Sequence, residues 1–292
     1  MDKYKPSESI DECCDFFSSL FLNGFQYLSY MSSIRKKHGF SLVELSIVLV
    51  ILGLLTGGIL AGQSLIRAAQ IRSVSNDIQK YTAAIFTFRD KYFALPGDMN
   101  NATAFWGVAA GDGNAFVNPC LSAGTDDGRT CNGNGDGRIS DVTASPTIGE
   151  SFRMWQHLSN AGLVEGSYRG TIGADLSRVM PSSKVKTGSV WFSMYIGASA
   201  GTTTSFAATA TQLFQLYGSG LTSFEFLRPE EAWNIDTKMD DGRPNLGSVR
   251  SNKGTSALPC STTFGQPIAA DVNTQYNLSS QVIACYIEYR FN

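Results

Sequence analysis

Apolar residues form one long, nearly uninterrupted run near the start of this chain. The run extends from Phe40 to about Gly62, and Glu44 is its only charged residue. About 20 apolar residues in a helix cross the hydrocarbon core of a bilayer. The 23 residues from Phe40 to Gly62 would reach roughly 34 Å as a helix. The run therefore predicts a membrane-spanning helix.

Beyond Gly62 the apolar residues become periodic. They recur at intervals of three, four or near multiples, which is typical of one face of an amphipathic helix. The residues are Leu65, Ile66, Ala69, Val74, Ile78, Tyr81, Ile85, Phe88 and Tyr92. Leu95-Pro96-Gly97-Asp98 should end the helix. We thus expect one long helix, with its first half in the membrane and its second half against a soluble head.

The next segments predict a loop region and a second helix. Residues 97–149 are crowded with Gly, Asp and Asn, and we expect an inserted loop region there rather than core. A second helix is expected over residues 150–162, because Met154, Trp155, Leu158 and Ala161 share one side and Gly162 follows. Trp155 should pack this helix against the long one. His157 is expected to be a structural or surface residue.

From about Ser189 the pattern favours strands. Residues 189–196, 212–217 and 281–291 are rich in β-branched and aromatic residues, and Gly- and Thr-rich turns separate them. Helices first and strands afterwards indicate an α+β fold. We expect a long N-terminal helical spine packed on an antiparallel β-sheet head with loop insertions.

Two features distinguish the apolar run from an ordinary signal peptide. A secretory signal carries its small-residue cleavage site after the apolar core, whereas Gly39 precedes the run here and follows Arg35-Lys36-Lys37-His38. Cleavage after Gly39 would leave the apolar helix on the mature chain. The second feature is Glu44, because a carboxylate within a membrane is costly and needs a partner. The ammonium that cleavage would create on Phe40 is the obvious one, in the same or a neighbouring subunit.

The sequence Gly39-Phe40-Ser41-Leu42-Val43-Glu44-Leu45 resembles the prepilin processing site of type IV pilins and type II secretion pseudopilins. The resemblance implies cleavage after Gly39 by a prepilin peptidase and N-methylation of Phe40. It also implies storage in the bacterial inner membrane as a single-pass protein with a periplasmic head, and then assembly with other pilin or pseudopilin subunits into a filament. Glu44 would neutralise the amino terminus of the adjacent subunit. The chain lacks the proline found midway in the apolar helix of many major pilins.

The resemblance suggests a division of the chain into four parts. Residues 1–39 form a leader that is removed, and translation starting at Met31 would make it a compact one. Residues 40–62 form the membrane and assembly helix, residues 63–96 its amphipathic continuation, and residues 97–292 the globular head. The large head favours a minor or tip-proximal subunit. The alternative is an inner-membrane-anchored periplasmic binding module or adhesin, with calcium as a candidate requirement, that does not polymerise.

Composition excludes several other functions. Residues 1–39 hold five basic and five acidic residues, so their removal leaves the net charge at −2. A chain without basic excess gives no indication of nucleic-acid binding. Only His157 remains of the two histidines, which disfavours histidine triads and zinc sites. Common catalytic motifs are absent from the sequence. We therefore expect no enzymatic activity and no required cofactor.

Four cysteines remain after processing: Cys120, Cys131, Cys260 and Cys285. An even number in an oxidising compartment suggests two disulfides, for which three connectivities exist. We favour Cys120–Cys131 and Cys260–Cys285, because each pair brackets a polar loop. A C-terminal disulfide loop is also similar to that of many pilins. Free buried thiols are the alternative.

Residues 132–140 match the first part of an EF-hand calcium loop. Asn132, Asn134, Asp136 and Ser140 would offer side-chain oxygens and Arg138 its backbone carbonyl. Gly137 permits the turn, and Ile139 should anchor the loop to the core. Thr143 stands at the twelfth position in place of glutamate, so Glu150 would have to fold back as the missing ligand. A plain Gly/Asn turn is the alternative.

Asp240 and Asp241 form another acidic turn, after a helix or short strand at residues 232–239. Some pseudopilins are similar in holding calcium in an acidic loop near the sheet. Two solvated aspartates in a polar turn are the simpler interpretation.

Overall fold

The computed structural model describes residues 41–109, 128–140, 149–171, 175–196, 211–217, 225–253, 260–262 and 273–291. Two compact units divide the chain, Met1–Leu60 and Ala61–Asn292, and each is described by itself. Gly39, Phe40 and the expected leader lie outside the described residues.

The long helix exists as the apolar pattern predicts. Helix α2 is continuous over Leu42–Tyr92, which is 51 residues. It ends where the sequence places a breaker, since Phe93 has a φ of 52° and Pro96 follows three residues later. Helix α2 is also the one helix within the described residues that is long and apolar enough to cross a membrane.

The second half of α2 forms one wall of the head. Its buried residues are Val74, Ile78, Tyr81, Ala84, Ile85 and Phe88, which recur at helical spacing. Leu65 and Ile66 were expected on the same packed face, but they are 71% and 63% exposed. Periodicity shows which side of a helix is apolar; how far along the helix the head extends depends on the other elements.

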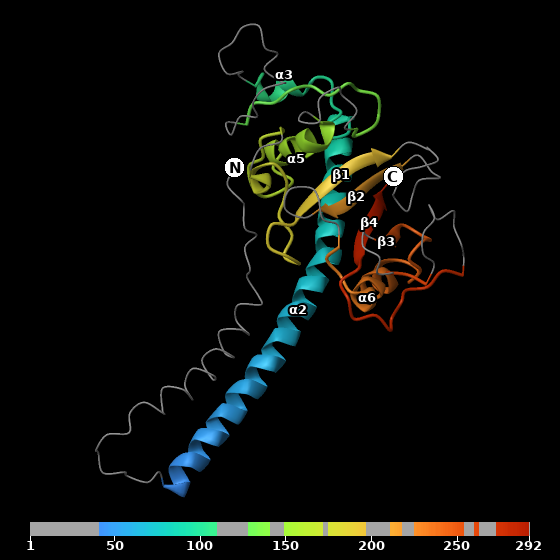
Figure 1. Cartoon of the computed structure of the whole chain (residues 1–292). Helices are drawn as coiled ribbons and strands as arrows, with labels where there is room; N and C mark the ends of the chain where they lie inside the picture. Colours follow the sequence, from blue (N-terminus) through green and yellow to red (C-terminus); the bar gives the residue numbers. More distant parts are fainter. Residues whose placement is uncertain are drawn as a thin grey trace, which may run out of the picture. The chain divides into compact units, whose positions relative to one another are not determined.

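A four-stranded antiparallel sheet packs against this helix (Figure 1). The strands are β1 (Val190–Ile196), β2 (Thr211–Tyr217), β3 (Val249–Lys253) and β4 (Cys285–Phe291), in the order β1-β2-β4-β3. Register pairs Ser193 with Phe214 and Phe214 with Tyr289. The expected α+β architecture is thus confirmed. The last strand begins at Cys285 rather than at residue 281.

Helix α5 (Glu150–Asn160) covers the core between α2 and the sheet. Trp155 is fully buried, as expected, and its ring meets the edge of Tyr81 on α2 at a centroid distance of 4.9 Å. On another side the ring stacks on Phe214 of β2 at 5.8 Å. Trp155 of α5 therefore contacts both the long helix and the sheet.

Residues 97–149 contribute more to the head than the expected loop region. Met99, Ala102 and Ile139 are buried in the main core, and a short helix α3 spans Ala102–Trp106. Ile139 lies in the core, which confirms the expectation that it anchors its loop. A loop needs only a few apolar side chains to attach it to a core. The low apolar content of this segment therefore gave no pattern from which these core residues could be predicted.

Helix α6 (Pro229–Met239) follows a 3-10 turn at Leu176–Arg178 and the first two strands. An ion pair joins α6 to α2. Arg67 donates from Nε and Nη2 to the two carboxylate oxygens of Glu231, both at 2.6 Å. Arg67 also donates to the backbone carbonyls of Val185 and Phe226 at 3.3 and 3.0 Å. These four bonds hold the start of the head's portion of α2 against three other segments.

Candidate functional site

The start of α2 contains a reciprocal cap that includes Glu44. The Glu44 carboxylate accepts a hydrogen bond from the backbone N–H of Ser41 at 2.9 Å. Ser41 Oγ in turn accepts one from the backbone N–H of Val43 at 3.3 Å. A Ser-x-x-Glu pattern is the sequence signature of such a cap, so the sequence contains a signal for Ser41, which was not among the predicted site residues. Glu44 is thereby aimed at the first residue after Phe40.

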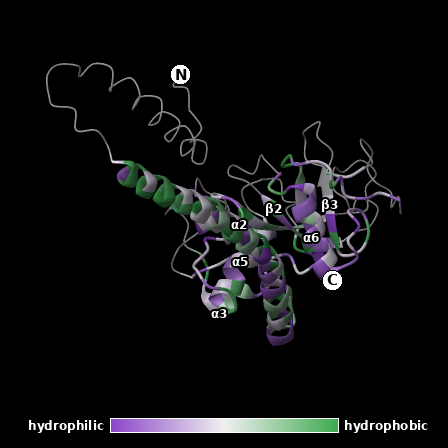
Figure 2. Cartoon of the chain, turned by 90° about the horizontal axis from the view of Figure 1, so that it is seen from below, coloured by the Kyte–Doolittle hydropathy of each residue, from purple (hydrophilic) through white to green (hydrophobic). Residues whose placement is uncertain are grey.

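Apolar side chains surround this cap and are exposed in the isolated chain. Leu42 is 87% exposed, and the large apolar residues from Val43 to Leu60 are all exposed. Figure 2 shows this part of α2 in mainly hydrophobic colours. Single exposed apolar residues are common, but contiguous apolar surface of this size marks a membrane or protein contact.

The EF-hand-like loop is organised around two buried carboxylates. Asp98 accepts hydrogen bonds from the backbone N–H groups of Gly135, Asp136 and Gly137 at 2.7, 3.0 and 2.9 Å. Glu150 accepts from the N–H of Asn134 at 2.9 Å and from the N–H and hydroxyl of Ser140 at 3.0 and 3.2 Å. Glu150 therefore folds onto the loop as the calcium hypothesis required.

The three alternating side chains of the loop also bind backbone N–H groups. Asn132 accepts from Thr103, Asn134 from Asp136, and Asp136 from Arg138, at 2.8 to 2.9 Å. The Arg138 guanidinium lies over the Tyr195 ring, 4.8 Å from its centroid. Asn134 and Asp136 thus stabilise the loop's own turns, whereas Asn132 binds the start of helix α3.

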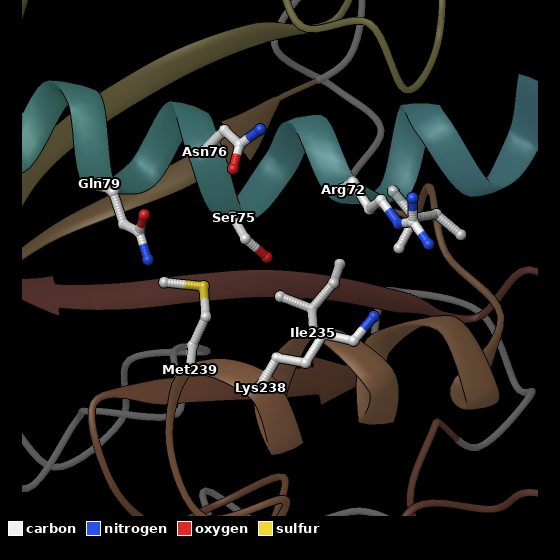
Figure 3. A pocket seen from close by; sticks show the side chains of 8 residues that line it. Arg72, Ser75, Asn76, Gln79, Ile235, Lys238 and Met239 are labelled. Carbon is white, nitrogen blue, oxygen red and sulfur yellow. The ribbon is translucent and has the colours of Figure 1, made fainter.

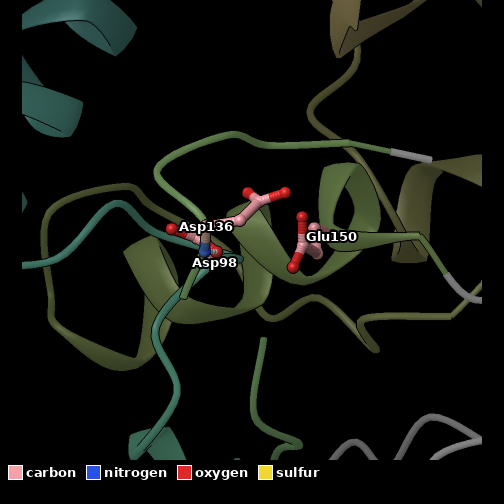
Figure 4. A group of neighbouring side chains, drawn as sticks. All are labelled: Asp98, Asp136 and Glu150. Atoms are coloured by element: carbon pink, nitrogen blue, oxygen red, sulfur yellow. Dashed lines mark hydrogen bonds between the residues drawn. The ribbon is translucent and has the colours of Figure 1, made fainter. Parts of the chain in front are cut away.

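Asp98, Asp136 and Glu150 bring carboxylate oxygens within 4.8 Å of one another (Figure 4). Burial raises the pKa of Asp98 and of Glu150, and the backbone N–H groups that they bind oppose this shift. Such a group of oxygens could hold a calcium ion, and calcium binding stays a prediction. Asp98 could not be predicted as part of this site, because nothing in the 33 intervening residues connects it with Asn132.

Replacing Asp98 with alanine should destabilise the head by about 1–2 kcal/mol, because three N–H groups would lose their acceptor. Urea unfolding of the full chain in detergent measures this difference. Asp90→Ala is the matched control: Asp90 is exposed on α2, so its replacement should change stability by less than about 0.5 kcal/mol. Equal effects of the two substitutions would contradict the role assigned to Asp98.

His157 is structural and fully buried on α5. Its Nδ1 accepts a hydrogen bond from the backbone N–H of Gly97 at 2.9 Å, so the ring proton is on Nε2. That nitrogen lies 3.0 Å from Thr130 Oγ1, which itself donates to Gln156 at 2.6 Å. Burial lowers the pKa of His157 to about 3, so the imidazole is neutral. The ring connects the turn after α2 to residues 130–131.

The aspartates of the second acidic turn also accept hydrogen bonds from neighbouring groups of the head. Asp236 is fully buried and accepts hydrogen bonds from the Tyr276 hydroxyl at 2.7 Å and the Gly242 N–H at 3.1 Å. Asp240 accepts from the backbone N–H groups of Ser248 and Val249, and so covers the outer edge of β3. Asp236, Asp240 and Asp241 place oxygens within 4.8 Å of one another. Calcium at this turn likewise stays a prediction.

The structure contains the expected disulfide between Cys260 and Cys285, with Cα atoms 5.1 Å apart. It attaches the segment before the last strand to the first residue of β4. Cys131 is also disulfide-bonded. Cys120 lies outside the described residues, so its pairing with Cys131 stays a prediction.

Comparison with known protein families identifies one sequence motif in this chain. Residues 34–60 match the family model of the prokaryotic N-terminal methylation motif. No curated protein and no solved structure matches the chain. The chain therefore carries the N-terminal signature of type IV pilins and pseudopilins. This signature supports a pilin-like subunit that prepilin peptidase processes and that assembles with other pilin subunits.

Proposed function

We propose that this protein is a minor subunit of a type IV pilus or type II secretion filament, assembled through the first part of α2. One observation carries the proposal: a methylation motif at residues 34–60 continues into a helix whose large apolar residues are exposed as far as Ile66. Such a surface is stable in a bilayer, or packed against the same helix of other subunits. A filament subunit uses both environments in succession.

Charge and cysteines support the proposed orientation. Arg35, Lys36 and Lys37 precede the apolar run, and an excess of basic residues marks the cytoplasmic side of a span. The Cys260–Cys285 disulfide lies in the head, and disulfides persist in oxidising compartments such as the periplasm. We infer an inner-membrane subunit with a periplasmic head.

Glu44 is proposed to capture an amino terminus during assembly. Its carboxylate already accepts one backbone N–H at the start of the helix. Cleavage after Gly39 creates an ammonium on Phe40, next to Ser41. An ammonium forms a stronger, charge-assisted bond to a carboxylate than an amide does. In an apolar surrounding, pairing the two charges removes a large cost for each.

The head is the reason for proposing a minor subunit. The head belongs to a large compact unit, Ala61–Asn292, whose loop segments reach the core through a few residues such as Met99, Ala102 and Ile139. A repeating subunit must pack the same surface at every position of a filament, whereas a subunit at the tip has fewer neighbours. No enzymatic activity is proposed.

Glu44→Ala tests this function. We expect the variant chain to be cleaved and to begin at N-methylated Phe40, but its amount in purified filaments to fall at least about tenfold, because the loss of one charge pair exceeds 1.4 kcal/mol. Peptide mass spectrometry of the amino terminus and quantitative immunoblots of filaments give the two readouts. Ser46→Ala, two residues further along the same exposed helix, should leave both unchanged.

Undiminished incorporation of the Glu44→Ala chain would contradict the role of Glu44. A wild-type chain that is left uncut, or that stays in the membrane when filaments form, would contradict the filament function itself. The membrane-anchored binding module would then account better for the apolar helix.

A further inference from the structure

A cavity of about 380 Å³ lies between the second half of α2 and helix α6 (Figure 3). Its apolar surface comes from Ile71 on α2 and from Ile235 and Met239 on α6. The polar lining includes Arg72 on α2 and Lys238 on α6, which the ion pair of Arg67 with Glu231 does not involve. All of these residues belong to the head unit.

The charged residues that line this cavity, among those that the structure describes, are both positive. Arg72 and Lys238 are exposed on the two facing helices, and none of the described residues that line the cavity carries a carboxylate. Within the described ranges, neither cation forms an ion pair, and the carboxylate of Glu231 on α6 is bound by Arg67 instead. Two like charges across one cavity repel each other, and a bound anion would relieve this repulsion.

The remaining polar groups are suited to a carboxylate. Ser75, Asn76 and Gln79 lie along α2 beside the cavity and can donate hydrogen bonds. Figure 3 shows the side chains of Ser75, Gln79 and Lys238 extending into the space between the two helices. Guanidinium and ammonium groups with neighbouring amides form strong bonds to carboxylates, while the apolar floor accommodates the stem of an aspartate or glutamate.

We propose that this cavity, the α2–α6 groove, binds an acidic segment of a neighbouring filament subunit. The inference rests on the proposed function, since it names a partner surface for the assembling chain. The complementary charges would add orientation to the apolar contacts of the N-terminal helix, because apolar packing alone permits many rotations and registers.

The position of the groove favours a protein over a lipid headgroup. Arg72 follows Gly62, the end of the apolar run, by ten residues, which is about 15 Å along a helix. The headgroup layer extends only about 5–8 Å beyond the hydrocarbon core. The phosphates of the lipids would therefore not extend far enough from the bilayer to contact both Arg72 and Lys238.

Photo-crosslinking in native membranes and filaments tests the proposal. The full chain carries p-benzoylphenylalanine in place of Gln79, and mass spectrometry identifies the linked peptide. We expect an Asp- or Glu-containing head segment of a subunit that has the same N-terminal motif. Arg72→Glu combined with Lys238→Glu should lower this product about tenfold or more. Lys184→Glu with Lys186→Glu reverses two exposed charges outside the groove and should leave the product unchanged.

A second substitution separates loss of binding from loss of folding. Changing the linked acidic residue of the partner to lysine should restore the product with the Arg72→Glu, Lys238→Glu chain, because the charges are complementary again. A linked lipid, or a product that charge reversal does not diminish, would overturn the groove while leaving filament entry and Phe40 methylation intact. A wild-type chain that enters no filament and links to no subunit would overturn both proposals.

Discussion

Replacing Trp155 with alanine should destabilise the head by about 4 kcal/mol, in the range found for large aromatic residues of a core. Trp155 is fully buried and contacts Tyr81 of α2 and Phe214 of β2. Its Nε1 has no hydrogen-bond partner within the described residues, so the loss would come from apolar packing and the cavity left behind. Urea unfolding of the full chain in detergent, followed by near-UV circular dichroism, measures the change.

Trp233→Ala is the matched control for this prediction. Trp233 lies on α6 and is 37% exposed, so removal of its ring leaves no closed cavity. We expect a loss of less than about 1 kcal/mol, since partly exposed side chains bury less apolar area. Losses of similar size in the two variants would show that Trp155 does not join the long helix to the sheet in the manner described.

The second large effect concerns pH. The pKa of His157 falls from 6.5 to about 3 because the ring is buried. The unfolded chain therefore binds a proton below pH 6.5 that the folded chain does not bind. His157 thus favours the folded state fully above pH 6.5, and this contribution declines as the pH falls toward 3. Linkage gives a loss of about 2 kcal/mol at pH 5 and about 4 kcal/mol near pH 3.5.

Asp236 acts in the opposite direction. Burial is the main cause that raises its pKa from 3.8 to about 7. The folded chain therefore binds a proton between pH 7 and 3.8 that the unfolded chain has released. The cost of the buried charge is present above pH 7, and protonation removes about 2–3 kcal/mol of it by pH 5. The contributions of His157 and Asp236 should nearly cancel in the wild-type chain between pH 7.5 and 5.

Single substitutions should reveal the opposing contributions of His157 and Asp236 to the pH dependence of stability. Between pH 7.5 and 5 we expect the stability of Asp236→Asn to fall by about 2 kcal/mol relative to the wild type, and that of His157→Gln to rise by about the same amount. Only the change of the free energy of unfolding with pH is compared. A difference in stability between the chains at pH 7.5 therefore does not affect the result. Parallel pH curves for all three chains would contradict both assignments.

Much of the fold could be predicted, because its strongest elements follow local patterns. A long apolar run with a periodic continuation indicates one helix, and α2 spans Leu42–Tyr92. Aromatic and β-branched segments indicated three of the four strands. The missed strand, β3, is Val-Arg-Ser-Asn-Lys, and its polar residues gave no strand signal. It forms because β4 offers a free edge, and the N–H of Ser251 on its far side bonds to the Pro244 carbonyl.

Some residues of the candidate sites could likewise be predicted from the sequence, and others could not. The processing motif and Glu44 are contiguous in the sequence, and they were identified there. Asp98 and the α2–α6 groove combine residues that are far apart along the chain. Lys238 and Arg72, for example, are separated by 166 positions (238 − 72). No short-range pattern relates such residues, because only the packing of α6 beside α2 brings them together.

The sequence by itself therefore determined the N-terminal signature, the long helix and the α+β order of elements, since each depends on neighbouring residues and on the polarity of one face. Only the tertiary structure decided where packing on α2 begins, that Asp98 and Glu150 hold the 132–140 loop, and that two cations without an ion pair among the described residues share one groove. Those features arise from contacts between distant segments. Such contacts become favourable only when the core has brought the segments together and excluded water from between them.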